Sequence, residues 1–285
     1  MGGCPSGERQ VAANIEFRPD LFHGSAADYE TFRVGYPNAL LDDLLRRIGA
    51  TGMGMLLDLA CGTGQIAFAL ATAFHEVWAV DQEPDMVGMV RDKATRAGKI
   101  HIQPVASAAE NLEAPLAAFE LVTIGNAFHR LRREAVAERI FDWLKPGGHV
   151  ALAWGDSPWV GDSDWQTAFS AILDRWKAAA AGRVPSGWDE HRQQRPDQLV
   201  LTEAGFEFLG AFSFSEGHSW TVDDLIGFVY STSFLPRHAL GKGTADFEAD
   251  MHSSLDHFGR GGLHQIVHFA YELYFRPPTP TRPSR

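Results

Sequence analysis

Residues 56–64 of this 285-residue chain read Leu56-Leu-Asp-Leu-Ala-Cys-Gly-Thr-Gly64 and are the strongest indication of its fold. The apolar run from Met55 to Ala60 predicts a buried strand, and the glycines that follow predict a tight loop. Residues 65–74 are rich in alanine and predict a helix. Gly62 and Gly64 allow the backbone to turn sharply and let a ligand approach where a Cβ atom would clash. Strand, Gly-rich loop and helix in this order predict a binding site at the end of the strand.

A second apolar run, Val77 to Val80, ends in the acidic residue Asp81. In an open parallel sheet, the carboxyl ends of neighbouring strands form the ligand crevice. A carboxylate at that position can accept hydrogen bonds from both hydroxyls of a ribose. The sequence therefore predicts that Gly62, Gly64 and Asp81 bind a cofactor that contains a nucleoside.

The identity of the nucleoside depends on the residues around the loop. Gly62-x-Gly64-x-x-Ala67 also fits the loose dinucleotide fingerprint, which would suit NAD. However, Asp58 lies inside the first strand, where a negative charge would not help to bind a pyrophosphate but could favour a cationic cofactor. No second Gly-rich phosphate loop follows. The segment 144–152 predicts a helix end, a Pro-Gly-Gly turn and another buried strand, which continues the parallel series.

Six segments in order resemble the motifs of the class I S-adenosylmethionine-dependent methyltransferases. Upstream, Asp28-Tyr29-x-x-x-Arg33-x-x-Tyr36-Pro37 resembles the entry segment of a small-molecule subgroup that includes trans-aconitate-methyltransferase-like proteins. The six segments are Asp58-Leu-Ala-Cys-Gly-Thr-Gly64, Asp81, Ala109-Glu110-Asn111-Leu112, Phe119-Glu-Leu-Val122, Ala127-Phe128-His129 and Leu144-Lys-Pro-Gly-Gly148.

The resemblance implies an α/β fold and S-adenosyl-L-methionine as the cofactor. The expected architecture is a Rossmann-like, doubly wound, mostly parallel seven-stranded sheet, with a C-terminal antiparallel hairpin and a helical lid over the acceptor site. The expected cofactor-binding residues are Tyr29, Arg33, Asp58, Ala60, Gly62, Gly64, Asp81, Gln82, Ala109, Glu110 and Asn126.

Several of these residues have a structural alternative. Tyr29 and Arg33 are four residues apart and share a helix face, so they could cover the cofactor and hold its carboxylate, or pack the lid. The backbone at Ala109 and Glu110 could frame the adenine edge, and Glu110 could equally be a solvated acid. Asn126 follows the fourth strand, beside the expected place of the methionine part.

His129 is the candidate catalytic residue, because we expect it at the crevice end of a core strand. A neutral imidazole there could take a proton from a hydroxyl or ammonium acceptor. The alternative is a packed or hydrogen-bonded structural histidine. We expect no metal site, since the other histidines are scattered and form no cluster with the two cysteines.

Composition narrows the class of protein. A hydrophobic content of 45% is sufficient for a core, and no apolar run reaches the length of a membrane span. The formal net charge of −11 disfavours nucleic-acid binding, which would require clustered Lys and Arg. Two cysteines argue against a disulfide scaffold, and we expect that the charged N-terminal segment, without an apolar stretch, is not a secretory signal. We therefore expect a cytoplasmic enzyme with no membrane partner, and the oligomeric state stays open.

The expected organisation is a mobile segment 1–22, a methyltransferase domain 23–275 and a Pro-rich tail 276–285. Within the domain, we expect a cofactor-binding core at about 38–154 and acceptor lid segments at about 155–195 and 216–260. The predicted helices are 38–49, 64–74, 84–97, 133–144, 199–205 and one that begins near Thr221; the predicted strands are 55–60, 76–81, 101–105, 119–125, 148–154, 206–214 and 263–275.

The predicted reaction is methyl transfer to a hydroxyl or amine of a small molecule. The acidic and aromatic character of the lid segments suits a cationic or sugar-like acceptor, such as an amino sugar, although a solvated acidic surface would look the same. The composition would suit bacterial secondary metabolism. Two alternatives remain: a dinucleotide-dependent oxidoreductase of the same fold, and a non-catalytic cofactor-binding scaffold.

Overall fold

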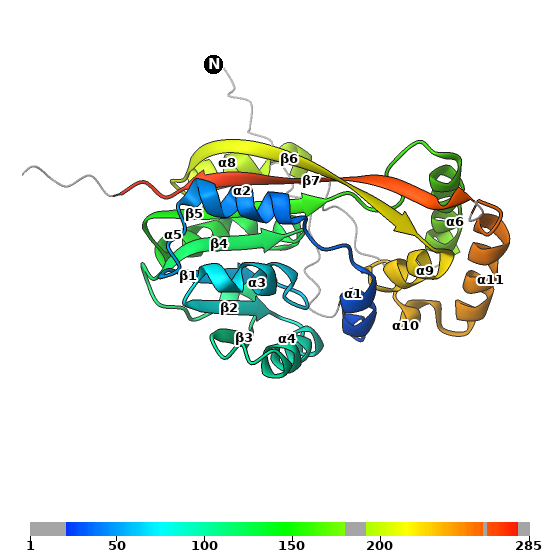
Figure 1. Ribbon diagram of the computed structural model, residues 1–285, viewed down its shortest axis with the longest axis horizontal. Coiled ribbons are helices and arrows are strands. Elements are labelled where there is room, and N and C mark those ends of the chain that lie inside the picture. Colours follow the sequence, from blue (N-terminus) through cyan, green and yellow to red (C-terminus); the bar gives the residue numbers. More distant parts are fainter. Residues whose placement is uncertain (1–20, 180–191, 259–260, 279–285) are drawn as a thin grey trace, which may run out of the picture.

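The computed structural model describes residues 21–179, 192–258 and 261–278, which form a sheet with helices on both faces (Figure 1). The sheet has seven strands in the order β3-β2-β1-β4-β5-β7-β6. The strands are β1 (Met55–Leu59), β2 (Glu76–Asp81), β3 (Ile102–Ala106), β4 (Phe119–Gly125), β5 (Leu144–Gly155), β6 (Glu207–Trp220) and β7 (Leu263–Phe275).

Strands β1 to β5 are parallel, and β7 is antiparallel to both of its neighbours, β5 and β6. The chain order reverses between β1 and β4, which places a topological switch point between these two strands. Ligands of open α/β sheets bind at such a point, outside the carboxyl ends of the strands. The predicted fold class, with a mostly parallel sheet and an antiparallel pair at its end, is confirmed.

Alternate residues of β1 supply two separate cores. Leu56 packs with the helices on one face of the sheet, whereas Leu57 and Leu59 pack with those on the other face. The first face is covered by α2 (Asn38–Ile48), α3 (Gln65–Leu70) and α4 (Pro84–Arg96). The second is covered by α5 (Arg133–Trp143) and α8 (Asp197–Glu203). Both faces of the strand are apolar because both are covered, which explains its nearly unbroken apolar run.

A third core joins the far ends of β6 and β7 to a group of helices (Figure 1). We call this group the lid: α6 (Asp164–Ala179), α9 (Val222–Tyr230), α10 (Arg237–Leu240) and α11 (Thr244–Leu255). Its buried residues include Phe169, Phe228 and Phe247. Helix α9 begins with a capping box, in which Thr221 and Asp224 each satisfy the backbone N–H of the other, as the sequence predicts.

Three elements differ from the sequence expectations by more than two residues at one end. The helix expected at 64–74 ends at Leu70 and continues as a 3₁₀ turn, η1 (Ala71–Ala73). Strand β5 begins at Leu144, which pairs with Phe119, rather than after the Pro-Gly-Gly turn. Strand β6 continues to Trp220, because its pairing with β7 extends that far. Residues 216–220, which were expected in the second lid segment, therefore belong to this strand.

The ends of the chain are described only in part. The expected mobile segment lies mainly outside the described residues, and so does most of the Pro-rich tail. The first residue of that tail, Arg276, continues the strand pairing, since its N–H donates to the carbonyl of Gly148 at 2.8 Å. Among the described helices, none combines the length and apolar character that a membrane crossing requires.

Candidate functional site

Two cavities open at the carboxyl ends of the parallel strands. The large cavity measures about 380 Å³ and lies over β2 and β4, between residues 81–86, 107–111 and 125–132. The small cavity measures about 50 Å³ and lies between the strand ends and the lid. Four residues line both cavities: Tyr29, Ala60, Gly125 and Asn126. The two cavities therefore meet at the switch point between β1 and β4.

The backbone is strained at this meeting point. Ala60 and Asn126, which follow β1 and β4, have positive φ values of 54° and 51°. Hydrogen bonds hold both turns: the N–H of Asn126 donates to the carbonyl of Ala153 at 2.8 Å, and that of Cys61 to Val80 at 2.9 Å. Such conformations cost about 1–3 kcal/mol each in non-glycine residues and cluster at functional sites.

The two glycines of the loop are required for different reasons. Gly62 lines the large cavity with φ +56°, and a Cβ atom on it would lie 3.3 Å from the ring of Tyr29. Gly64 begins α3 with φ +83°, and a Cβ atom there would lie 3.1 Å from Phe68 and 3.2 Å from Val90. Gly64 is not among the residues that line either cavity. Its contribution is to the shape of the loop.

Asp81 ends β2 and lines the large cavity, as expected. Its two carboxylate oxygens accept hydrogen bonds from the N–H of Gly62 at 2.8 Å and of Glu83 at 2.9 Å. These bonds orient the carboxylate and tie it to the Gly-rich loop. Burial raises the pKa of Asp81, while the backbone donors oppose that shift.

Glu83 is a cavity residue that the sequence analysis missed. Its side chain is only 4% exposed and lines the large cavity, yet its Oε1 atom has no hydrogen-bond partner. Burial and the neighbouring Asp81 raise its pKa. A buried acceptor without a donor indicates a place for a ligand donor. The available signal was its position two residues after Asp81, at the start of the next helix.

Asp58 is 1% exposed and lines the small cavity. It accepts hydrogen bonds from the hydroxyl of Thr123 at 2.8 Å and from the N–H of Ala67 at 3.0 Å. It therefore ties β1 to β4 and to the first turn of α3. Burial raises its pKa to about 7, against the effect of these two hydrogen bonds.

Gln82, Ala109 and Glu110 all line the large cavity. Ala109 and Glu110 lie in the 3₁₀ turn η2 (Ala109–Asn111), beyond the end of β3. The carboxylate of Glu110 accepts the N–H of Arg132 at 2.9 Å. This bond holds together two loops that border the cavity.

Tyr29 and Arg33 lie on the segment that connects the sheet with the lid. Tyr29 belongs to α1 (Ala26–Phe32), which ends just before Arg33. The Arg33 guanidinium donates to the hydroxyl of Ser231 at 2.8 Å and to its carbonyl at 3.0 Å. It also lies 4.5 Å from the ring centroid of Phe228 and 4.9 Å from that of Tyr29. Arg33 therefore both packs the lid and lines the small cavity.

His129 lies in the 3₁₀ turn η3 (Phe128–Arg130) and is not among the residues that line either cavity. Its Nε2 atom accepts a hydrogen bond from Arg130 at 3.2 Å. Burial, with the charges of Arg130, Arg192 and Arg133, lowers its pKa to about 3. Such an imidazole is neutral but a weak proton acceptor. This geometry favours the structural alternative over the catalytic one.

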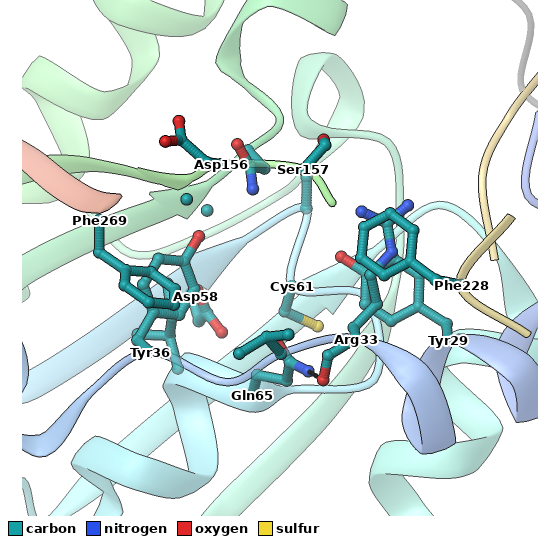
Figure 2. Close-up of a pocket in the computed structure, with 16 residues that line it drawn as sticks. Tyr29, Arg33, Tyr36, Asp58, Cys61, Gln65, Asp156, Ser157, Phe228 and Phe269 are labelled. Carbon is teal, nitrogen blue, oxygen red and sulfur yellow. Dashed lines mark hydrogen bonds between the residues drawn. The ribbon is translucent and has the colours of Figure 1, made fainter. Parts of the chain in front are cut away.

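The small cavity contains further residues that the sequence analysis did not assign to the site. Figure 2 shows Asp156 and Ser157 on one side of it and Cys61 and Gln65 on the other. The remaining unassigned lining residues include Tyr36, Phe228 and Phe269. Among the described residues, no group of three or more His, Cys, Asp or Glu side chains could hold a metal ion.

Comparisons with known proteins agree with this geometry. A family model described as "Methyltransferase domain" matches residues 56–148. An uncharacterized methyltransferase of Schizosaccharomyces pombe is 28% identical over 148 residues, which cover 49% of this chain and 55% of that protein. One of Mycobacterium tuberculosis is 28% identical over 135 residues, or 47% of this chain and 52% of that protein. The matched region thus spans about half the length of these relatives.

Solved structures share the fold at low sequence identity. The Haemonchus contortus phosphoethanolamine N-methyltransferase 2 has a TM-score of 0.52 and 15% identity, and the match covers 94% of this chain and 61% of that chain. The cyclase SpnF has a TM-score of 0.51 and 18% identity, with coverage of 87% and 84%. The fold alone therefore does not define the reaction. The motif order, the domain match over residues 56–148 and the cavities at the switch point together make this chain similar to the class I S-adenosylmethionine-dependent methyltransferases.

Proposed function

We propose that this protein transfers a methyl group from S-adenosyl-L-methionine to a hydroxyl or amine of a small molecule. The observation that carries the proposal is the pair of joined cavities, with hydrogen-bond-accepting carboxylates in one and a half-buried guanidinium in the other. Asp81 and Glu83 lie in the large cavity, and Arg33 lies in the small one.

The large cavity fits the adenosine part of the cofactor. Glu83 Oε1 is a buried acceptor without a donor, and Asp81 lies beside it. A ribose would supply the missing donors, since its two hydroxyls can both donate hydrogen bonds to carboxylates. The backbone around Ala109 lines the same cavity and would border the adenine.

The small cavity fits the methionine part. Arg33 forms no ion pair with any carboxylate of the described residues, although it is half-buried and hydrogen-bonded to Ser231. Desolvation lowers the pKa of this guanidinium, so a ligand carboxylate would stabilise its charge. Asn126 and Tyr29, which line both cavities, would border the bond between the two parts of the cofactor.

The protein's task is mainly one of positioning. When bound, the cofactor supplies a methyl group that its sulfonium already activates. The strained turns at Ala60 and Asn126 fix the floor of the site, and the lid side chain Phe228 closes its side and excludes water. Asp58 places a carboxyl group beside the small cavity, where its ionised form would favour the sulfonium charge.

We further propose that the acceptor is small and enters beneath the lid, from the side of Ser157 and Phe269. Ser157 and Phe269 lie on the small cavity, between the strand ends and the lid, so the acceptor would approach the methyl group there. The Haemonchus contortus neighbour is described with phosphomonomethylethanolamine and S-adenosylhomocysteine, so this fold can accommodate a small acceptor.

Calorimetry with S-adenosylmethionine, S-adenosylhomocysteine and NADH tests the proposal. We expect the first two to bind with micromolar dissociation constants, and NADH to show no binding. Saturation with S-adenosylhomocysteine at 100 times its dissociation constant should stabilise the fold by about 2.7 kcal/mol. Screening metabolite pools for transfer of a labelled methyl group would then identify the acceptor. Binding of NADH alone would support the oxidoreductase alternative and end the proposal.

A further inference from the structure

The loop that follows β5 carries a carboxylate to the small cavity. Strand β5 ends at Gly155, and both Asp156 and Ser157 line the cavity (Figure 2). The N–H of Asp156 donates to the carbonyl of His268 in β7 at 2.9 Å. This bond ties the base of the loop to the antiparallel part of the sheet.

Two buried glutamines hold the rest of this loop in place. Gln265, from β7, donates to the carbonyl of Ser157 at 3.0 Å, and Gln166, from α6, donates to that of Val160 at 2.7 Å. Each glutamine is only 5% exposed, and Trp220 donates to the Gln265 carbonyl oxygen at 3.0 Å. A buried, satisfied amide network rigidifies its surroundings. The loop is therefore fixed before any acceptor arrives.

The Asp156 carboxylate forms no hydrogen bond or ion pair with any residue that the structure describes, and it is half-buried. Asp58, the other acid of the small cavity, already has two donors. Arg33 is the one basic residue among the described side chains that line this cavity, and it is bonded to Ser231 between two aromatic rings. The negative charge of Asp156 is therefore available to a ligand.

Aromatic side chains complete the surroundings of this carboxylate. Tyr36 and Phe269 line the same cavity, with ring centroids 6.0 Å apart. Aromatic faces attract cations, and charge-assisted hydrogen bonds to a carboxylate are stronger than neutral ones. An anionic group would be repelled, and a neutral hydroxyl would gain less than an ammonium group.

We infer that Asp156 determines acceptor specificity by binding an ammonium group, so that the acceptor is an amine-bearing small molecule. This inference rests on the proposed function for the identity of the site. The role is recognition: Asp156 holds the charged group of the acceptor and no proton has to move to it.

Two probes of the same shape test this role, namely benzylamine as the cation and benzyl alcohol as its neutral counterpart. Their dissociation constants are measured by NMR titration, with the free protein and with the protein saturated with S-adenosylhomocysteine. The variant is Asp156→Asn, which keeps the shape and removes the charge. The matched control is Asp162→Asn, an exposed aspartate of the same connection between β5 and α6.

We expect wild type and Asp162→Asn to bind benzylamine at least about tenfold more tightly than benzyl alcohol. In Asp156→Asn this preference should fall below about threefold. Three outcomes would each overturn the inference. Wild type could bind the two probes equally, or it could bind neither at 50 mM, about the weakest affinity such a titration detects. The third outcome is a preference for benzylamine that survives in Asp156→Asn. Failure of S-adenosylhomocysteine to bind would instead count against the proposed function, and the free-protein titration would still report on Asp156.

Discussion

The site has two sides that are built in different ways: the nucleoside side, which is the large cavity, and the lid side, which is the small cavity. On the nucleoside side, the bonds that shape the site join residues close in sequence: Gly62 and Asp81 are 19 residues apart, and Asp81 and Glu83 only two. On the lid side, the corresponding bonds join Arg33 to Ser231, 198 residues away, and Gln265 to Ser157, 108 residues away. A local motif forms the first half, and the folding of the whole chain forms the second.

The two sides of the site should therefore respond differently to substitution. Substitutions on the nucleoside side should alter cofactor binding with the fold intact, because strands β1 and β2 have their own core on each face. Substitutions on the lid side should alter stability or acceptor binding, because the lid depends on a separate core. Four predictions, from the largest expected effect to the smallest, test this division.

The largest effect should come from the lid core. Phe247 is fully buried, and its ring lies 5.5 Å from that of Trp176 and 5.8 Å from that of Tyr230. Truncating a buried phenylalanine typically costs about 3–5 kcal/mol. We expect Phe247→Ala to lower the free energy of unfolding by that amount, measured by urea denaturation.

The control for this variant is Leu209→Ala on the edge strand β6, where the side chain is 48% exposed. That change should stay within about 0.5 kcal/mol of wild type. If Phe247→Ala lowers the free energy of unfolding by less than about 1 kcal/mol, the lid core contributes little to the stability of the domain. The lid side would then not depend on a separate core.

The second effect concerns the ribose carboxylate. Asp81→Ala should weaken S-adenosylhomocysteine binding tenfold to a hundredfold, because hydrogen bonds to a charged group contribute about 1.5–3 kcal/mol. The matched control is Asp85→Ala, an exposed acid in the first turn of α4, which should bind as wild type does. Calorimetry decides between the two outcomes. An unchanged dissociation constant for Asp81→Ala would refute the ribose assignment.

The third effect is a pH dependence that reports on Asp58. Its pKa is raised to about 7, so the buried carboxyl is neutral below that pH and ionised above it. The unfolded chain loses this proton near pH 4, so Asp58 makes the free protein less stable as the pH rises from about 4 to 7. An ionised Asp58 should favour the sulfonium of S-adenosylmethionine over the neutral sulfur of its product.

We therefore expect the affinity for S-adenosylmethionine, divided by that for S-adenosylhomocysteine, to rise several-fold, up to about tenfold, between pH 6 and pH 8. Parallel titrations of both ligands across this range measure the ratio. In Asp58→Asn the ratio should be flat. A flat ratio in wild type would show that Asp58 does not sense the sulfonium.

The smallest effect should come from His129. Since it lines neither cavity and its pKa is lowered to about 3, His129→Ala should change cofactor affinity less than about twofold. Methyl transfer should fall by less than about tenfold, whereas loss of a general base costs about 10²–10⁴. Turnover of the acceptor found in the label screen, measured beside cofactor binding, distinguishes the two. A loss of more than a hundredfold with unchanged cofactor binding would restore the catalytic role.

Much of the nucleoside side could be predicted from the sequence, because local signals encode it. Strand β2 and the position of Asp81 at its end match the prediction. Glu83 was missed because its burial depends on how the loops after β2 and β3 border the large cavity. The catalytic role expected for His129 gains no support for a similar reason. His129 follows the fourth strand, but the 3₁₀ turn places the residue away from both cavities.

The order of elements, the Gly-rich loop and the acid after β2 can be derived from the sequence alone, since these depend on periodicity, turn chemistry and chain-local spacing. Which side chains face the small cavity depends on the tertiary fold. Asp156 and Ser157 come from the loop after β5, Phe269 comes from β7, and no short-range pattern connects the two segments. Their meeting depends on the pairing of β5 with β7 and on the lid core. Long-range packing fixes both.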